Sequence, residues 1–102
     1  MLLLHPNCEC CDKDLPPDST EDNICSYECT FCSDCVKDIL QNVCPNCGGG
    51  FVPRPLRPKK EYRPQVSIAH QTASRKRILT QYSKDEITEF CIAIKDISLE
   101  SR

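Results

Sequence analysis

Cys25-Ser26-Tyr27-Glu28-Cys29-Thr30-Phe31-Cys32-Ser33-Asp34-Cys35 is the stretch that decides the fold, because it holds four thiols separated by only two or three residues. A spacing of two residues lets both thiolates of one tight turn reach a single metal ion, about 2.3 Å from each sulfur. The same spacing recurs outside the stretch, as Cys8-x2-Cys11 before it and Cys44-x2-Cys47 after it. The segment therefore predicts a cysteine-bound metal centre.

The apolar residues around these thiols are too few to form a stable core. Nine of the ten cysteines lie between Cys8 and Cys47, and the chain has no Trp. About fifty residues with so few large apolar side chains cannot offset their conformational entropy by burial alone. Small units of this kind depend on disulfides or on metal ions for their stability.

The first residues favour metal over disulfides. Met1 to Leu4 are followed directly by His5 and Pro6, which does not match the basic leader and long apolar run of a secretory signal. No stretch approaches the length of a transmembrane helix. We therefore expect a cytoplasmic protein whose thiols stay reduced and bind metal. Disulfides would also leave one of the nine clustered thiols unpaired.

Eight of the cysteines make two sets of four, which is the ligand number of structural zinc. Four thiolates close a tetrahedral site and leave no position for water, so we expect two structural Zn²⁺ ions and no catalytic one. The sets can be sequential, with the first four and the last four ligands together. They can also be interleaved, with the first pair joined to the third and the second pair to the fourth. The predicted ligands are Cys8, Cys11, Cys25, Cys29, Cys32, Cys35, Cys44 and Cys47.

Two cysteines are left over. Cys10 adjoins Cys11 and is an alternative ligand for the first site, although the two-residue spacing favours Cys11. We expect Cys91 to pack as a small apolar side chain on a helix. His5 and His70 are isolated in the sequence, and we expect both at the surface.

Cys29-Thr30-Phe31-Cys32-Ser33-Asp34-Cys35 resembles the middle of a RING finger, and Cys44-Pro45-Asn46-Cys47 resembles the last cysteine pair of that family. RING fingers bind two zinc ions in a cross-brace, so the resemblance implies the interleaved sets. The chain departs from ubiquitin-ligase RING fingers at Cys29, where His is usual, and at Gly48, where a basic residue is frequent. These departures weaken the surface that would hold a ubiquitin-conjugating enzyme.

Residues 1–58 also resemble a family of short bacterial Cys-rich proteins known only as domain-of-unknown-function family 1272. The resemblance implies a relative but no activity. It is carried by Pro6-Asn7-Cys8-Glu9-Cys10-Cys11-Asp12-Lys13-Asp14-Leu15-Pro16-Pro17, by Glu28-Cys29-Thr30-Phe31-Cys32 and by Cys44-Pro45-Asn46-Cys47-Gly48-Gly49.

The chain divides into three parts by composition. Residues 1–53 form the Cys-rich domain, for which we expect a small zinc-stabilised α+β fold with a RING-like or treble-clef-like cross-brace. In it we expect a short β-hairpin, a strand at residues 2–4 and a short helix from about residue 34 to 41. Residues 54–64 form a proline-rich basic linker, expected to be extended and solvated. Residues 65–102 form an extension whose capping box, Ser83 with Glu86, predicts a helix over residues 84–97.

Charge is distributed unevenly along the chain. Residues 1–50 carry two basic and nine acidic side chains, whereas residues 51–102 carry eleven basic and six acidic ones. An acidic Cys-rich domain is unsuited to binding nucleic acid. Any such contact would be weak and would come from the basic linker between Arg54 and Arg63.

The sequence contains no catalytic constellation: no cysteine–histidine pair at a recognisable spacing, no phosphate loop and no metal site with an open position. It favours a non-enzymatic zinc module that binds another protein, with the apolar face of the C-terminal helix as a surface for a homo-oligomer. Two alternatives stay open. One is a RING-type E3 ubiquitin-ligase-like domain. The other is an iron–sulfur or redox protein that uses Cys29, Cys32, Cys35 and Cys44, whose spacing partly matches a ferredoxin run.

Overall fold

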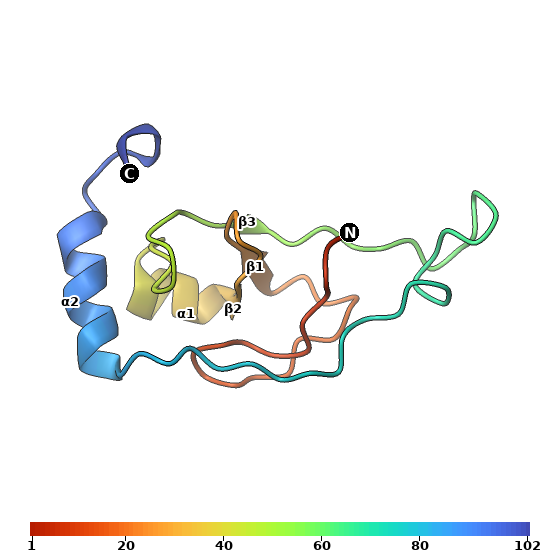
Figure 1. Cartoon of the computed structure of the whole chain (residues 1–102), viewed down its shortest axis with the longest axis horizontal. Coiled ribbons are helices and arrows are strands. Elements are labelled where there is room, and N and C mark those ends of the chain that lie inside the picture. The colour runs from red at the N-terminus through yellow and green to blue at the C-terminus, as the bar shows by residue number, and fades with distance from the viewer.

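A three-stranded antiparallel sheet occupies the centre of the computed structural model, which describes residues 1–102 (Figure 1). A helical turn follows the sheet directly, and a longer helix packs at one end of the molecule. The expected small α+β fold is therefore confirmed. The elements are β1 (Asp22–Ile24), β2 (Thr30–Cys32), α1 (Ser33–Cys35), the π-helical turn η1 (Val36–Leu40), β3 (Val52–Pro53), α2 (Lys84–Ile94) and the 3-10 turn η2 (Leu99–Ser101).

The strand order of the sheet is β2-β1-β3. β1 and β2 form the expected hairpin, with Ile24 opposite Thr30, and the turn between them carries Cys25 and Cys29. Glu28 adopts a left-handed conformation at φ 66° and closes this turn. β3 pairs with the other side of β1 and brings the chain back from the last cysteine pair.

The helix expected after Cys32 is present but short and irregular. α1 passes directly into η1, in which the backbone widens to π-helical geometry. The helix ends at Leu40 because Gln41 and Asn42 both take left-handed conformations, at φ 49° and 61°. Leu40 is fully buried, so this turn still contributes to the core.

The capping box predicted at the start of the C-terminal helix is confirmed. The Ser83 hydroxyl accepts from the Glu86 N–H, and the Glu86 carboxylate accepts from the Ser83 N–H. The helix ends at Ile94, three residues before the predicted end. Backbone carbonyls freed beyond that point accept from the guanidinium of Arg102, which bonds the Ile97 and Lys95 carbonyl oxygens.

One core joins the Cys-rich domain to α2. It contains six cysteines but only five larger apolar side chains, so the expected shortage of apolar packing is real. Ile87 and Cys91 are buried in it from α2, and Cys91 packs as expected, with its sulfur 3.7 Å from the Val43 carbonyl oxygen. The larger apolar members are Leu15, Phe31, Leu40, Val43 and Ile87.

Two local expectations are wrong. Residues 2–4 do not form a strand, although Leu4 is buried and its carbonyl accepts from the Ser74 N–H at 3.0 Å. Arg54, counted with the solvated linker, is only 4% exposed, because its guanidinium forms an ion pair with the buried Asp22.

No helix of the structure combines the length and apolar character needed to cross a membrane.

The segment that leads into α2 runs along the N-terminal segment (Figure 1). Besides the Ser74 contact, the Thr80 N–H donates to the Glu9 carbonyl at 2.9 Å. The C-terminal extension is thus held against the Cys-rich domain by an extended strap as well as by α2.

Candidate metal centre

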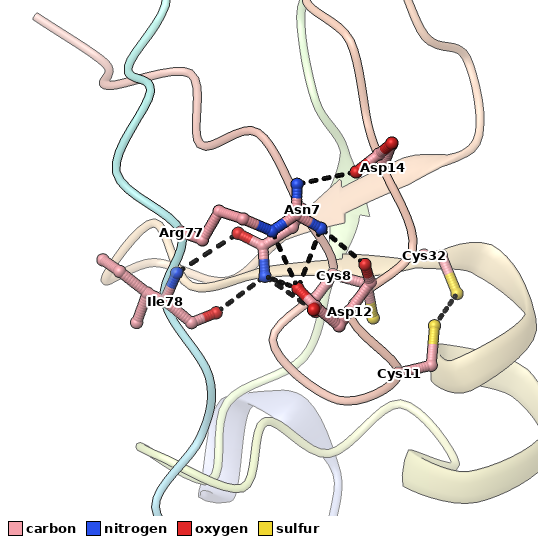
Figure 2. Close-up of polar contacts among 8 residues, drawn as sticks. All are labelled: Asn7, Cys8, Cys11, Asp12, Asp14, Cys32, Arg77 and Ile78. Carbon is pink, nitrogen blue, oxygen red and sulfur yellow. Dashed lines mark hydrogen bonds and ion pairs between the residues drawn. The ribbon is translucent and has the colours of Figure 1, made fainter.

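The first thiol group gathers Cys8, Cys11, Cys32 and Cys35. Their four sulfur atoms all lie within 4.8 Å of one another, and all but the Cys11 side chain are buried. The sulfurs of Cys11 and Cys32 are 3.7 Å apart (Figure 2). A tetrahedral zinc ion with bonds of about 2.3 Å separates its sulfur ligands by about 3.8 Å, so this separation suits that ion.

The second group brings together Cys25, Cys44 and Cys47, whose sulfurs also lie within 4.8 Å of one another. Cys29 lies close enough to the Cys44 and Cys25 thiols for them to lower its pKa, but it lies outside that tightest set. The two groups interleave along the chain, which is the cross-brace order and excludes the sequential one. Whether all eight thiols are ligands stays a prediction.

The first and last cysteine pairs have the same backbone geometry. In each, the N–H four residues after the first cysteine donates to that cysteine's carbonyl, from Asp12 to Cys8 and from Gly48 to Cys44. Asp12 and Gly48 are both left-handed, at φ 64° and 83°. Glycine adopts that conformation freely and aspartate tolerates it, which explains the residue types after Cys11 and Cys47.

Backbone N–H groups point at the sulfurs of both groups. The N–H of the second residue after a cysteine donates to its sulfur at Cys11, Cys25, Cys44 and Cys47. At Cys47 the donor is Gly49, 3.4 Å from the sulfur. Such bonds disperse the negative charge of a thiolate and hold it in position for a metal ion.

Burial makes it costly to ionise these thiols side by side. It raises the pKa of Cys25 to about 11 and raises that of Cys35 well above its usual range. The pKa of Cys44 is also raised, because its thiol donates to the Cys29 sulfur and because it is buried. Cys29 receives that bond, which lowers its pKa to about 5. A bound cation would supply the positive charge that lets the clustered thiols lose their protons together.

Cys10 lies beside the first group without belonging to it. Burial raises the pKa of its thiol, and the nearby Cys35 thiol opposes that shift. The structure thus places Cys11 in the group and Cys10 next to it. The two histidines are absent from both groups. His70 contacts the Ser67 hydroxyl at 3.0 Å, in the segment that follows the linker along the chain.

Sequence reasoning missed the polar side chains that tie the thiol groups together. Glu9 is buried and only 6% exposed. Its carboxylate accepts from the Thr30 N–H at 2.8 Å and from the Asn46 amide at 3.1 Å. It therefore links the first cysteine pair to β2 and to the last pair. Its place inside a cysteine pair is the one signal in the sequence that points to this role.

Asn7 is a second such residue, fully buried directly before Cys8. Its amide nitrogen donates to the Cys8 carbonyl at 3.1 Å, to the Asp12 carboxylate at 3.0 Å and to the Ile78 carbonyl at 2.9 Å (Figure 2). Nothing in the sequence connects Asn7 to residues around 78, because the two segments are distant along the chain.

Comparison with known proteins agrees with the resemblance noted in the sequence. The model of the family described as "Protein of unknown function (DUF1272)" matches residues 1–57. An uncharacterized protein of Rhizobium meliloti (strain 1021) is 62% identical over 58 residues, which are 57% of this chain and 69% of that protein. No solved structure matches the chain.

Proposed function

Since the chain belongs to the DUF1272 family, whose description assigns no function, we propose from its site that it is a non-enzymatic zinc module. In this proposal two Zn²⁺ ions hold the Cys-rich domain together, and the domain presents a surface to another protein in a reducing compartment such as the cytoplasm. The observation that carries it is the pair of interleaved thiol groups, each able to hold a metal ion.

Three features support structural zinc over other metal chemistry. The first group already offers the four thiols of a closed tetrahedral site, and with Cys29 as its fourth ligand the second group would likewise leave no position for water or substrate. The sulfurs receive backbone N–H bonds of the kind that stabilise metal thiolates. The core is short of apolar side chains, so an ion that contributes on the order of 10 kcal/mol of binding free energy would decide whether the domain folds.

Metal analysis of protein purified under reducing conditions tests the proposal. We expect a colourless protein with two zinc ions per chain, and loss of its folded circular dichroism signal when a strong chelator removes them. A metal-free chain that keeps a cooperative unfolding transition would contradict the proposal. A brown protein that contains iron and acid-labile sulfide would instead support the iron–sulfur alternative.

The ligase alternative has a separate test. An assay of ubiquitin transfer with a panel of conjugating enzymes should give no ubiquitinated product if the module only binds its partner. Product that forms with the intact chain, and not after the metal is removed, would replace the proposal with a ligase function.

A further inference from the structure

The C-terminal extension, residues 65–102, is held by polar groups of the N-terminal segment that hydrogen-bond to its backbone. We define the strap as residues 74–80 and the cradle as Leu4, Asn7, Glu9, Asp12 and Asp14. The strap lies parallel to the N-terminal segment, with Ser74 bonded to Leu4 and Thr80 to Glu9. Between these two bonds, the buried Asn7 side chain makes the hydrogen bonds to the strap that the backbone of a neighbouring strand would otherwise make.

Asn7 binds the backbone of Ile78 at both its polar groups. Its oxygen accepts from the Ile78 N–H at 3.2 Å, and its nitrogen donates to the Ile78 carbonyl at 2.9 Å (Figure 2). A paired contact of this kind recognises extended backbone, whatever side chain that residue carries. It requires an extended segment, because a helix would use the same two groups internally.

Arg77 supplies the one strongly selective side-chain contact. Its guanidinium donates to the Asp12 carboxylate at 2.9 and 3.1 Å, to the Asp12 carbonyl at 2.6 Å and to the Asp14 carboxylate at 2.6 Å. The planar guanidinium spreads its donors over three nitrogens, all of which are used here, whereas a lysine ammonium places its three donors on one atom, so lysine would be a poor replacement.

The rest of the strap is bound without being buried. Its neighbouring basic residues, Arg75 and Lys76, are exposed, and Leu79 is 57% exposed. Thr80 adds one further side-chain bond, from its hydroxyl to the Asn46 side chain at 2.9 Å. The strap therefore resembles a docked peptide more than a core element.

The cradle lies wholly within residues 1–57, the part that the family model matches, whereas the strap lies outside it. The cradle is also acidic and the strap basic, which favours their association. We propose that the cradle is a recognition site for an extended peptide of another protein with the order Arg-x-x-Thr, and that the strap fills this site in cis. The inference rests on the proposed interaction function and names its surface and the class of its partner.

A tethered segment competes strongly with a free one, because the tether keeps it at an effective concentration in the millimolar range. The test therefore uses a full-length chain in which residues 74–80 are replaced by a Gly/Ser sequence of equal length, so that α2 stays attached. The probe is a fluorescein-labelled peptide of residues 72–82, followed by fluorescence anisotropy. We expect saturable binding that is at least about tenfold tighter than to the intact chain.

Two matched changes separate recognition from simple charge attraction. A probe with Arg77→Lys keeps its charge, and we expect it to bind about fivefold more weakly, because a single ammonium nitrogen cannot reproduce the four bonds that three guanidinium nitrogens make. Asp12→Asn with Asp14→Asn in the replaced chain should weaken the parent probe similarly. Equal binding of the arginine and lysine probes, or no saturable binding to a replaced chain with native circular dichroism, would overturn the proposal.

Zinc content and circular dichroism are measured on the same samples, so a failure of the zinc proposal is seen independently of probe binding. If the replaced chain does not fold, the intact chain with Arg77→Ala takes its place, and we expect about fivefold tighter probe binding than to the unaltered chain. Unchanged binding there overturns the proposal. Two intact chains could instead exchange their straps and form a dimer, which light scattering would detect. That result would show that the partner is a second copy of this chain, and it would overturn the proposal of a peptide from another protein.

Discussion

Arg54 and Asp22 form an ion pair whose side chains are 0% and 1% exposed to solvent. The Arg54 guanidinium also donates to the His5 carbonyl at 2.8 Å and to the Pro16 carbonyl at 3.2 Å. Burial raises the pKa of Asp22 and lowers that of Arg54, while the attraction between the two groups opposes both shifts. The pair fastens the end of β3 to β1 and to the N-terminal loops.

Removing one partner of this pair should destabilise the domain strongly. We expect Arg54→Met to lower the free energy of unfolding by about 3–5 kcal/mol, because it leaves the Asp22 carboxylate buried without a countercharge. Urea unfolding of the zinc-loaded protein measures the change. Arg63→Met, at an exposed position of the same basic segment, is the control and should change stability by less than about 0.5 kcal/mol.

The double variant Arg54→Met with Asp22→Asn sharpens this prediction. It should recover part of the loss, because no charge is then left buried. A double variant no more stable than Arg54→Met alone would show that the lost hydrogen bonds of Arg54, and not the unpaired charge of Asp22, account for the effect.

Adjacent cysteines offer a matched test of the first thiol group. We expect Cys11→Ser to reduce the zinc content from two ions per chain to about one, because it removes a member of that group. Cys10→Ser should retain both ions, since Cys10 lies outside the group. Mass spectrometry under native conditions reads the stoichiometry directly. The reverse result would assign the ligand role to Cys10.

Cys29, the predicted fourth ligand of the second group, is tested by replacing it with another zinc-binding side chain and with one that cannot bind zinc. Histidine is an accepted zinc ligand, so Cys29→His should keep two zinc ions per chain, whereas Cys29→Ala should weaken binding at that site. Full zinc affinity in Cys29→Ala would mean that the second group holds its ion with the three tightest sulfurs and a ligand other than Cys29.

Zinc binding should weaken steeply with acid. A cysteine thiol has a pKa of about 8.5 in an unfolded chain, and burial raises the pKa of Cys25 to about 11 in the folded one, so binding an ion below pH 7.5 expels its proton in either case. Stability from the ion is therefore present at neutral pH and is lost as the pH falls. Between pH 7.5 and 5.5 the apparent affinity should drop at least about 100-fold, tenfold per unit for this thiol alone. Competition with a chromogenic chelator measures it, and an affinity independent of pH would exclude thiolate ligation.

Two isoleucines on α2 should differ sharply when truncated. Ile87 is 4% exposed in the shared core, and Ile92 on the same helix is 56% exposed. We expect Ile87→Ala to lower the free energy of unfolding by about 2–4 kcal/mol through the cavity that it leaves. Ile92→Ala should cost less than about 0.5 kcal/mol. Similar losses at both positions would indicate that Ile92 is covered in solution, as in a homo-oligomer.

The features that could be predicted from sequence are those whose partners are close along the chain. The cysteine pairs are local turns, and their spacing alone indicates that both thiols reach one ion. Ser83 and Glu86 are likewise three residues apart, so the start of α2 was predictable. The interleaved order needed more than spacing, and only the resemblance to RING fingers indicated it.

The features that could not be predicted are pairings between distant segments. Arg54 stands among prolines and basic residues, and its burial depends on Asp22, which lies in β1. Glu9 lies inside a cysteine pair, but neither its position nor that of Asn7 identifies β2 or the strap as the segment that it binds. These three polar side chains are buried because each bonds a group in a segment distant along the chain.

Both thiol groups are complete by Cys47, which has a consequence for how the chain is made. Proteins leave the ribosome from their N-terminus, and early segments fold while later ones are still being translated. All the candidate ligands therefore emerge before Cys91, so a metal ion captured at that time meets no competition from this last thiol. The strap and α2 then arrive at a finished surface, and their docking is a separate, later step of maturation.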